Sequence, residues 1–272
     1  HTQLLVWTNQ TIPALTYTIT EPSSAIGETI PGSAISAGFV RYVITDEFAG
    51  GCGYRKPADF DSSLSPDAID IVPNIPVEKN TVQPLWLSVQ IPPDIAAGVY
   101  NGTITIRADQ SYQLPFSIRV INNTLPPPSA WSFDLDLWQH PAAIARVHGV
   151  PLWSDEHFSL MKPYYTMLAN AGQKNITASI MEEPWGHQTY DDFPSLIKWT
   201  KKKNGTWVYD YSLFDKYISF VMSCGITKRI NCYSMVPWAL SFRYYDEATQ
   251  KDTALKAAVG SPEYNTHWTT ML

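Results

Sequence analysis

The chain has 272 residues, of which 44% are hydrophobic, 13% aromatic and 16% charged, and its formal net charge is −6. This length allows one large domain or two medium ones with a substantial buried core. The apolar content is too high and the net charge too small for a disordered chain. Nucleic acid is excluded as a partner, because an acidic chain whose longest basic run is Lys201-Lys202-Lys203 offers no electrostatic footprint for phosphates.

No stretch of the sequence approaches the roughly 18 uninterrupted apolar residues of a membrane span. The three cysteines, Cys52, Cys224 and Cys232, are too few for a disulfide framework. We expect all three to be reduced core residues, with a Cys224–Cys232 pair as the less favoured alternative. The aromatic, charge-poor and mildly acidic composition suits a protein that binds polymers outside the cytoplasm, so we expect a periplasmic or extracellular location.

Up to about residue 125, the sequence predicts short antiparallel strands. Leu85, Leu87 and Val89 alternate with polar or aromatic residues, and the run from 114 to 120 repeats the pattern. Such alternation, bounded by proline and glycine, marks strands with one buried face. Several short strands with turn signals between them predict a β-sandwich.

The proline-rich segment TLPPPS at 124–129 is the clearest boundary in the chain. Consecutive prolines form a stiff, extended linker rather than a helix or a central strand. We therefore predict two domains, a β-sandwich at 1–125 and a second domain at 126–272.

After this linker, predicted strands and helices alternate. They are a strand at 131–138, a helix at 155–171, a strand at 176–181, a helix at 212–223, a strand at 228–235 and a helix that begins at Pro262. This order is typical of parallel βαβ units. Three such units do not close an eight-fold barrel, which needs about 250 residues. The prediction is therefore a multi-domain β and α/β protein whose sandwich precedes an incomplete, truncated (β/α)8 barrel, with a small open α/β sheet as the alternative.

The carboxyl ends of the three predicted strands carry aromatic rings, carboxylates and histidines. In a parallel barrel, functional side chains lie at these ends. A sugar needs a flat apolar surface for its carbon face and polar partners for its hydroxyls. We therefore predict a carbohydrate-binding site, over the plainer interpretation that the rings cap a core. The candidate residues are Asp134, Asp136, Trp138, His140, Glu182, Glu183, Trp185, His187, Tyr233 and Trp238.

Two pairs of consecutive acids need separate interpretation. Glu182 and Glu183 would face opposite sides of a regular strand, although either could bend into a pocket before Pro184. Asp246 and Glu247 lie in an expected long polar loop, where we interpret them as solvated. The histidines lack metal-ligand spacing and no glycine-rich phosphate loop occurs, so we expect no metal and no cofactor.

Seven short motifs give the chain a family resemblance. They are FVRYVITDEF at 39–48, GCGYR at 51–55, WLSVQIP at 86–92, GVYNGT at 98–103, FDLDLWQHP at 133–141, PYY at 163–165 and GSPEY at 260–264. With these motifs the whole chain resembles glycoside hydrolase family 123 and the related barrel proteins labelled DUF4091. The GVYNGT hairpin is shared by many sandwich domains, whereas FDLDLWQHP is more specific.

The resemblance implies a β-sandwich followed by a (β/α)8 catalytic barrel that removes terminal β-linked N-acetylgalactosamine from glycans. It also implies substrate assistance, in which the acetamido oxygen of the sugar attacks the anomeric carbon and an adjacent Asp-Glu pair orients it and exchanges the proton. The resemblance places that pair at the end of the fourth barrel strand, beyond Leu272. Asp246-Glu247 precedes the helix at Pro262 and does not fit the role. This chain is then expected to hold part of the sugar pocket and no catalytic residue.

Two other functions stay open at this point. One is a non-catalytic carbohydrate-binding or scaffold protein with the same fold. The other is a retaining hydrolase in which Glu183 is the acid or base. In the first domain we expect Asp46, Glu47 and Arg55 to form a structural polar network rather than a catalytic one.

Overall fold

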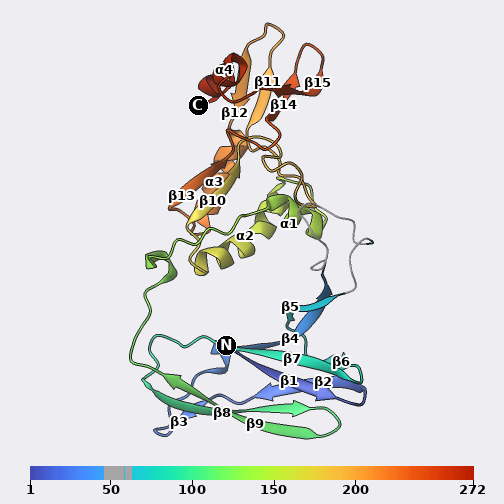
Figure 1. Cartoon of the computed structure of the whole chain (residues 1–272). Helices are drawn as coiled ribbons and strands as arrows, with labels where there is room; N and C mark the ends of the chain where they lie inside the picture. Colours follow the sequence, from blue (N-terminus) through green and yellow to red (C-terminus); the bar gives the residue numbers. More distant parts are fainter. Residues whose placement is uncertain (46–57, 59–62) are drawn as a thin grey trace. The chain divides into compact units, whose positions relative to one another are not determined.

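The computed structural model describes residues 1–45, 58 and 63–272, and the chain divides into two compact units with a boundary between Leu125 and Pro126 (Figure 1). The motif at 51–55, the end of the motif at 39–48 and the expected network of Asp46, Glu47 and Arg55 lie outside the described residues. Cys52 lies outside them as well. Each unit is described by itself below.

The first unit consists of two antiparallel sheets. One sheet has the order β1-β7-β4-β5; in the other the order is β3-β8-β2-β6, and β9 pairs with β8. The strands are β1 Thr2–Thr8, β2 Ile12–Ile19, β3 Ser23–Ser24, β4 Ile35–Ile44, β5 Leu64–Asp70, β6 Ile75–Val77, β7 Thr81–Val89, β8 Gly98–Arg107 and β9 Ser111–Val120. The alternating runs that the sequence indicated around 85–89 and 114–120 lie in β7 and β9.

Both sheets of the first unit contribute to one buried cluster. Phe39 and Leu85 come from the β1-β7-β4-β5 sheet, and Leu15, Ile104 and Ile106 come from the other sheet. In β8, buried and less buried residues alternate, which is the pattern of a strand with one face on a core. This shared core holds the unit together, because each buried aliphatic side chain contributes roughly 1.5–3 kcal/mol relative to exposure.

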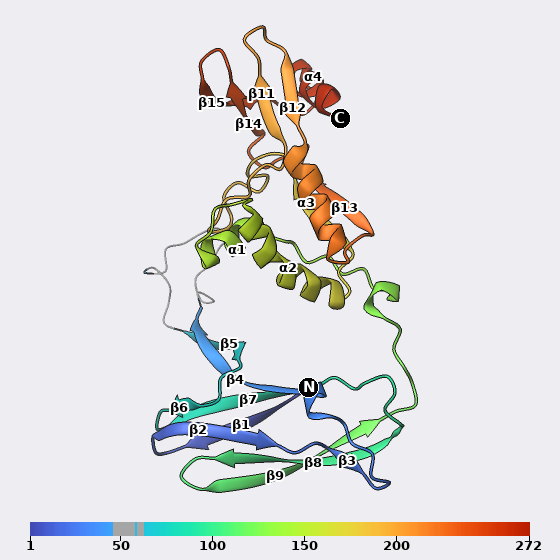
Figure 2. The same ribbon diagram turned by 180° about the vertical axis from the view of Figure 1, so that it is seen from behind.

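The second unit contains a parallel pair, β10-β13, and a four-stranded mixed sheet of order β12-β11-β14-β15. Figure 2 shows the same elements from behind. The strands are β10 Asn175–Ser179, β11 Lys198–Lys201, β12 Trp207–Asp210, β13 Arg229–Tyr233, β14 Ser241–Asp246 and β15 Lys251–Lys256. The helices are α1 Pro141–His148, α2 Asp155–Asn170, α3 Ser212–Ser223 and α4 Pro262–Met271, after a short 3-10 turn at Pro128–Ala130.

Local sequence signals placed the long helices well. Ser154 and Ser261 accept hydrogen bonds from the backbone amides of His157 and Tyr264, and so cap α2 and α4 as N-cap serines do. Gly172 follows α2 with a φ of 90°, in the left-handed region that favours glycine. The helix expected at 212–223 has these same bounds in α3.

The strand expected at 131–138 is wrong in form. Within the described residues, this segment forms a single bridge, Leu135 to Gln173, rather than a ladder. Glutamine side chains replace the missing backbone bonds: Gln173 Oε1 accepts from the amide of Leu137 at 2.8 Å, and Gln139 Oε1 accepts from the amide of Thr177 at 2.7 Å. The segment therefore runs beside β10 without becoming a regular strand.

The long polar loop expected around Asp246 and Glu247 is also wrong, because β14 and β15 form a hairpin there. Asp246 ends β14 and accepts from the amide of Ala248, and Glu247 pairs with Lys202. The sequence analysis missed β11, β12 and α1 too. These strands have only four residues each, too few for an alternation to stand out.

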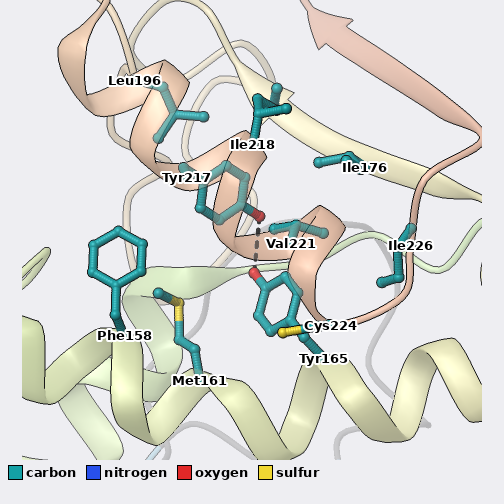
Figure 3. Packing of buried hydrophobic residues seen from close by; sticks show 11 residues of the cluster. Phe158, Met161, Tyr165, Ile176, Leu196, Tyr217, Ile218, Val221, Cys224 and Ile226 are labelled. Atoms are coloured by element: carbon teal, nitrogen blue, oxygen red, sulfur yellow. Dashed lines mark hydrogen bonds between the residues drawn. The ribbon is translucent and has the colours of Figure 1, made fainter.

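The main core of the second unit lies where α2 and α3 pack around β10 (Figure 3). Tyr165 and Tyr217 are fully buried there, and their hydroxyls share a hydrogen bond of 2.8 Å. Burial raises the pKa of both phenols, so both stay neutral. Cys224 is a free, buried member of this cluster, as expected, whereas Cys232 is free but exposed, which corrects its placement in the core.

A second core joins α4 to the mixed sheet, and it encloses a histidine. His267 is 2% exposed, its ring centroid lies 4.0 Å from that of Trp199 and 4.6 Å from that of Trp207, and its Nδ1 lies 3.2 Å from the Tyr209 hydroxyl. Its Nε2 has no hydrogen-bond partner among the described residues. Burial lowers the pKa of His267 to about 4, because the apolar surroundings disfavour the charged ring.

The tyrosine pair should show strong non-additivity. Tyr217→Phe alone leaves the Tyr165 hydroxyl buried without a partner, so we expect a loss of about 1–2 kcal/mol of unfolding free energy. Tyr165→Phe should cost a similar amount, and the double variant should cost less than the sum of the two, because no orphan hydroxyl remains. Urea unfolding of the four proteins measures this cycle. Additive losses would contradict the pairing.

The buried histidine should make the fold sensitive to acid. The folded pKa of His267 lies below the unfolded value near 6.5, so the unfolded chain binds more protons between these values and stability falls as pH drops from about 6.5 towards 4. The loss is roughly 3 kcal/mol at most. His267→Gln should weaken this pH dependence, as measured by denaturant unfolding at pH 7 and pH 4.5. Comparing both proteins at pH 7 removes the packing effect, and an unchanged pH dependence would refute the assignment.

Candidate functional site

Three aromatic side chains from separate segments meet at the carboxyl ends of β10 and β13. Trp138 stacks on Trp185 with a centroid distance of 4.7 Å and an interplanar angle of 27°. Tyr233, the last residue of β13, lies 5.3 Å from Trp138 and 4.9 Å from Trp185 between ring centroids. Trp185 lies in the loop that follows β10, and Trp138 lies in the irregular segment beside β10. We call Trp138, Trp185 and Tyr233 the ring cluster.

The ring cluster has a buried side and an exposed side. Trp185 is 8% exposed and packs against Phe193 at 4.6 Å, whereas Trp138 is 54% exposed. His140 lies against the same Phe193, with centroids 3.8 Å apart, and burial lowers the pKa of His140 so that its neutral form is favoured. Trp185 thus covers one face of the Trp138 indole, and the other face is open to solvent.

One carboxylate, that of Asp136, lies beside the ring cluster. Asp136 accepts a hydrogen bond of 3.0 Å from Asn231, two residues before Tyr233 on β13. Burial and then the charge of Asp136 raise the pKa of Tyr233, so the phenol remains a hydrogen-bond donor. Glu182 pairs with Arg243 of β14 and is partly exposed. Asp136 and the Tyr233 phenol thus offer an acceptor and a donor beside the aromatic rings.

Glu183 has a structural task in the loop after β10. It is 8% exposed, its Oε2 accepts from the amide of His187 at 2.7 Å, and its Oε1 accepts from the amide of Phe193. Its own amide donates to the Phe193 carbonyl at 2.9 Å. Its φ of 52° is unusual for a residue other than glycine, and the carboxylate bonds offset that strain. Glu183 therefore holds the loop that carries Trp185.

Three other predicted site residues have side chains whose observed contacts do not involve the three rings. Asp134 pairs at 2.8 Å with Arg229, the first residue of β13, so it lies at the amino ends of the strands, and Arg229 lowers the pKa of this carboxyl. His187 is exposed and bonds Asp192 at 3.0 Å, which raises the pKa of the imidazole. Trp238 is exposed, and its amide donates to the Pro184 carbonyl.

Glu183, His187 and Asp192 are the group of described residues whose ligand atoms could approach one metal ion, within 4.8 Å of one another. Both oxygens of Glu183 already accept backbone amides, and these bonds account for the arrangement. We therefore assign these three residues a structural role in the loop after β10.

No helix among the described residues has the length and apolarity needed to cross a membrane.

Sequence reasoning missed three residues of this region: Asn231, Phe193 and Arg243. Asn231 left a usable signal, because residues two apart on a strand share a face and Tyr233 was already a candidate. Phe193 and Arg243 left none, because they come from a loop and from an unexpected hairpin. Chemically, an exposed indole beside a carboxylate and a phenol suits the apolar face and hydroxyl rim of a sugar.

Two sequence profiles match the chain. Residues 138–272 match the profile described as glycoside hydrolase 123, catalytic domain, and residues 1–108 match the glycoside hydrolase 123 N-terminal domain. Together these matches cover most of both units and indicate the glycoside hydrolase class. The chain belongs to glycoside hydrolase family 123.

A solved structure is similar over nearly the whole chain. It comes from a study of the details of glycolipid glycan hydrolysis by a family 123 glycoside hydrolase from Clostridium perfringens. The two are 30% identical with a TM-score of 0.90, and the similarity covers 99% of this chain and 48% of that one. The chain thus spans about half the length of this neighbour. A comparison with curated proteins gave no match.

The two consecutive glutamates should differ sharply in their effect on stability. Glu183→Ala leaves the amides of His187 and Phe193 without acceptors, so we expect a loss of about 2–4 kcal/mol of unfolding free energy. Glu182→Ala, the matched control, removes a partly exposed ion pair and should cost less than about 1 kcal/mol. Urea unfolding measures both. Equal losses would show that Glu183 does not hold the loop.

Proposed function

We propose that this chain is part of a glycoside hydrolase that removes terminal β-linked N-acetylhexosamine, specifically N-acetylgalactosamine, from glycans by substrate-assisted, retaining hydrolysis. Family membership and the glycolipid glycan hydrolysis of the Clostridium perfringens neighbour support a glycan substrate. The periplasm or the cell exterior, where glycans are accessible, is the proposed location. The carbohydrate is the proposed partner.

For the fold, we propose a β-sandwich at 1–125 followed by the first part of a (β/α)8 barrel at 126–272. The shared core of the two antiparallel sheets supports the sandwich. The segment at 135–139, β10 and β13 lie in parallel order, and helices follow each of them. Within the described part of the chain β13 pairs only with β10, and Ile230 and Cys232 are exposed on it, as expected for a strand that receives a further neighbour.

The exposed face of Trp138 is the observation that carries the proposal. A pyranose stacked there would place its hydroxyls near Asp136 and Glu182, whose oxygens accept hydrogen bonds. The sugar would stack on the Trp138 ring, which Trp185 and Tyr233 already hold in place. Little conformational entropy of this side chain is therefore lost on binding.

The carboxylate contacts argue against Glu182 or Glu183 as the nucleophile. Glu183 accepts two backbone amides, and Glu182 is paired with Arg243, so neither is a free nucleophile at the ring cluster. In the proposed reaction, the acetamido oxygen of the sugar forms the bond to the anomeric carbon while the aglycone leaves with a proton from a general acid. The residues of this chain bind and orient the sugar, and the Asp-Glu pair of the family pattern belongs to the strand after α4.

The full-length protein should hydrolyse an aryl β-N-acetylgalactosaminide and leave the corresponding aryl β-galactoside unchanged, because only the first substrate carries the acetamido oxygen. Release of the aryl group, followed by absorbance, measures both rates. Equal turnover of the two substrates would overturn substrate assistance. Saccharide binding without turnover of either would indicate a non-catalytic binding protein.

A variant of the ring cluster tests the site in the same assay. Trp138→Ala should lower kcat/KM by about tenfold or more, mainly through KM, because it removes the stacking surface. Phe133→Ala is the matched control, since Phe133 is an exposed aromatic residue in the same segment but outside the ring cluster. Its kcat/KM should stay near that of the parent protein. An unchanged KM in Trp138→Ala would remove the site assignment.

A further inference from the structure

The first unit has a cavity of its own at one end of its two sheets. It has a volume of about 480 Å³ and lies between the connection from β1 to β2 and the turn from β8 to β9. In both ribbon views this connection and this turn lie at the same end of the unit (Figures 1 and 2). The volume falls within the range of about 300–1,000 Å³ that is typical of small-molecule sites. None of its lining residues belongs to the ring cluster.

Two aromatic side chains line this cavity and remain exposed. Trp7 of β1 is 64% exposed and Tyr112 of β9 is 45% exposed. The Tyr112 hydroxyl donates to Asp109 Oδ1 at 3.2 Å and accepts from Gln110 Nε2 at 2.8 Å. The Gln110 amide donates to the same Asp109 oxygen at 2.9 Å. The turn therefore fixes the phenol in place before any ligand arrives.

Polar groups flank the apolar residues that line the cavity, such as Leu4, Ile106 and Leu114. Thr8 closes the β1–β2 connection through hydrogen bonds with the amide and carbonyl of Gln10, so the backbone there is held while the side chains of Asn9 and Gln10 remain exposed. Asp109 is the only charged residue among the described residues that line the cavity. This single carboxylate disfavours anionic ligands. An apolar ligand would strip water from the amides and the carboxylate without replacing their hydrogen bonds.

We propose that this cavity is a second saccharide-binding site, specific for neutral sugars. Trp7 and Tyr112 supply flat apolar surfaces for the carbon faces of a pyranose, and Asp109, Asn9 and Gln10 supply partners for its hydroxyls. The site goes beyond the hydrolase function proposed above, because it lies in the other unit and takes part in no bond cleavage. Its role is to hold a glycan on the protein, so it increases the local concentration of substrate.

Titration of the isotopically labelled 272-residue chain with lactose, maltotriose and N,N′-diacetylchitobiose tests this proposal. We expect saturable chemical-shift changes of the backbone amides at 8–11 and 109–112 with at least one of these neutral saccharides, at millimolar concentrations. Trp7→Ala should weaken this binding by about tenfold or more. Asp109→Asn should weaken it by about threefold, which provides a second, milder variant. Circular dichroism checks that both variants keep the fold.

The second site would be overturned by the absence of a saturable change at these amides with all three saccharides, or by a change that Trp7→Ala leaves intact. Occupation of the cavity by laurate in place of the sugars would also overturn it. Trp138→Ala separates this proposal from the hydrolase function, since it should leave the shifts at 8–11 and 109–112 unchanged. Conversely, Trp7→Ala should leave the hydrolysis of a small aryl glycoside near the parent rate.

Discussion

Two glutamine side chains determine where the ring cluster can form. Gln139 exchanges hydrogen bonds with Thr177 of β10: its side-chain Oε1 accepts from the Thr177 backbone amide, and its backbone amide donates to the Thr177 hydroxyl at 3.2 Å. Gln173 accepts from the amide of Leu137 and donates to the carbonyl of Asn175 at 2.7 Å. Each bond contributes about 0.5–1.5 kcal/mol, so together they hold an irregular segment against β10. Trp138 lies between Leu137 and Gln139, which both make these bonds, so its position along β10 is fixed.

The rest of the site depends on that position and on the loop after β10. The Glu183 carboxylate accepts two backbone amides of the loop, and the loop places Trp185 in stacking contact with Trp138. Tyr233 arrives independently at the end of β13, whose register with β10 places it opposite Ser179. An exposed indole would be mobile on an unsupported segment. Here, backbone bonds, side-chain bonds and ring stacking restrain it from three directions, so binding costs little conformational entropy.

The sequence could predict features that depend on local chemistry. The bounds of α3, the start of α4 at Pro262 and the parallel strands β10 and β13 follow from periodicity and local helix signals. The same reasoning picked Trp138, Trp185 and Tyr233 as strand-end rings, and these three meet. What it could not predict depends on distant partners. Asp134 faces Arg229 at the amino ends of the strands, and Glu183 is held by amides four and ten residues away.

The most direct test of the ring cluster as a sugar-binding site is a crystal structure of the full-length protein with N-acetylgalactosamine bound. The expected result is a pyranose stacked on the exposed face of Trp138, with hydroxyls in hydrogen-bond contact with Asp136 or Glu182. A sugar bound in the second unit without contact to Trp138, Trp185 or Tyr233 would contradict the role assigned to the ring cluster.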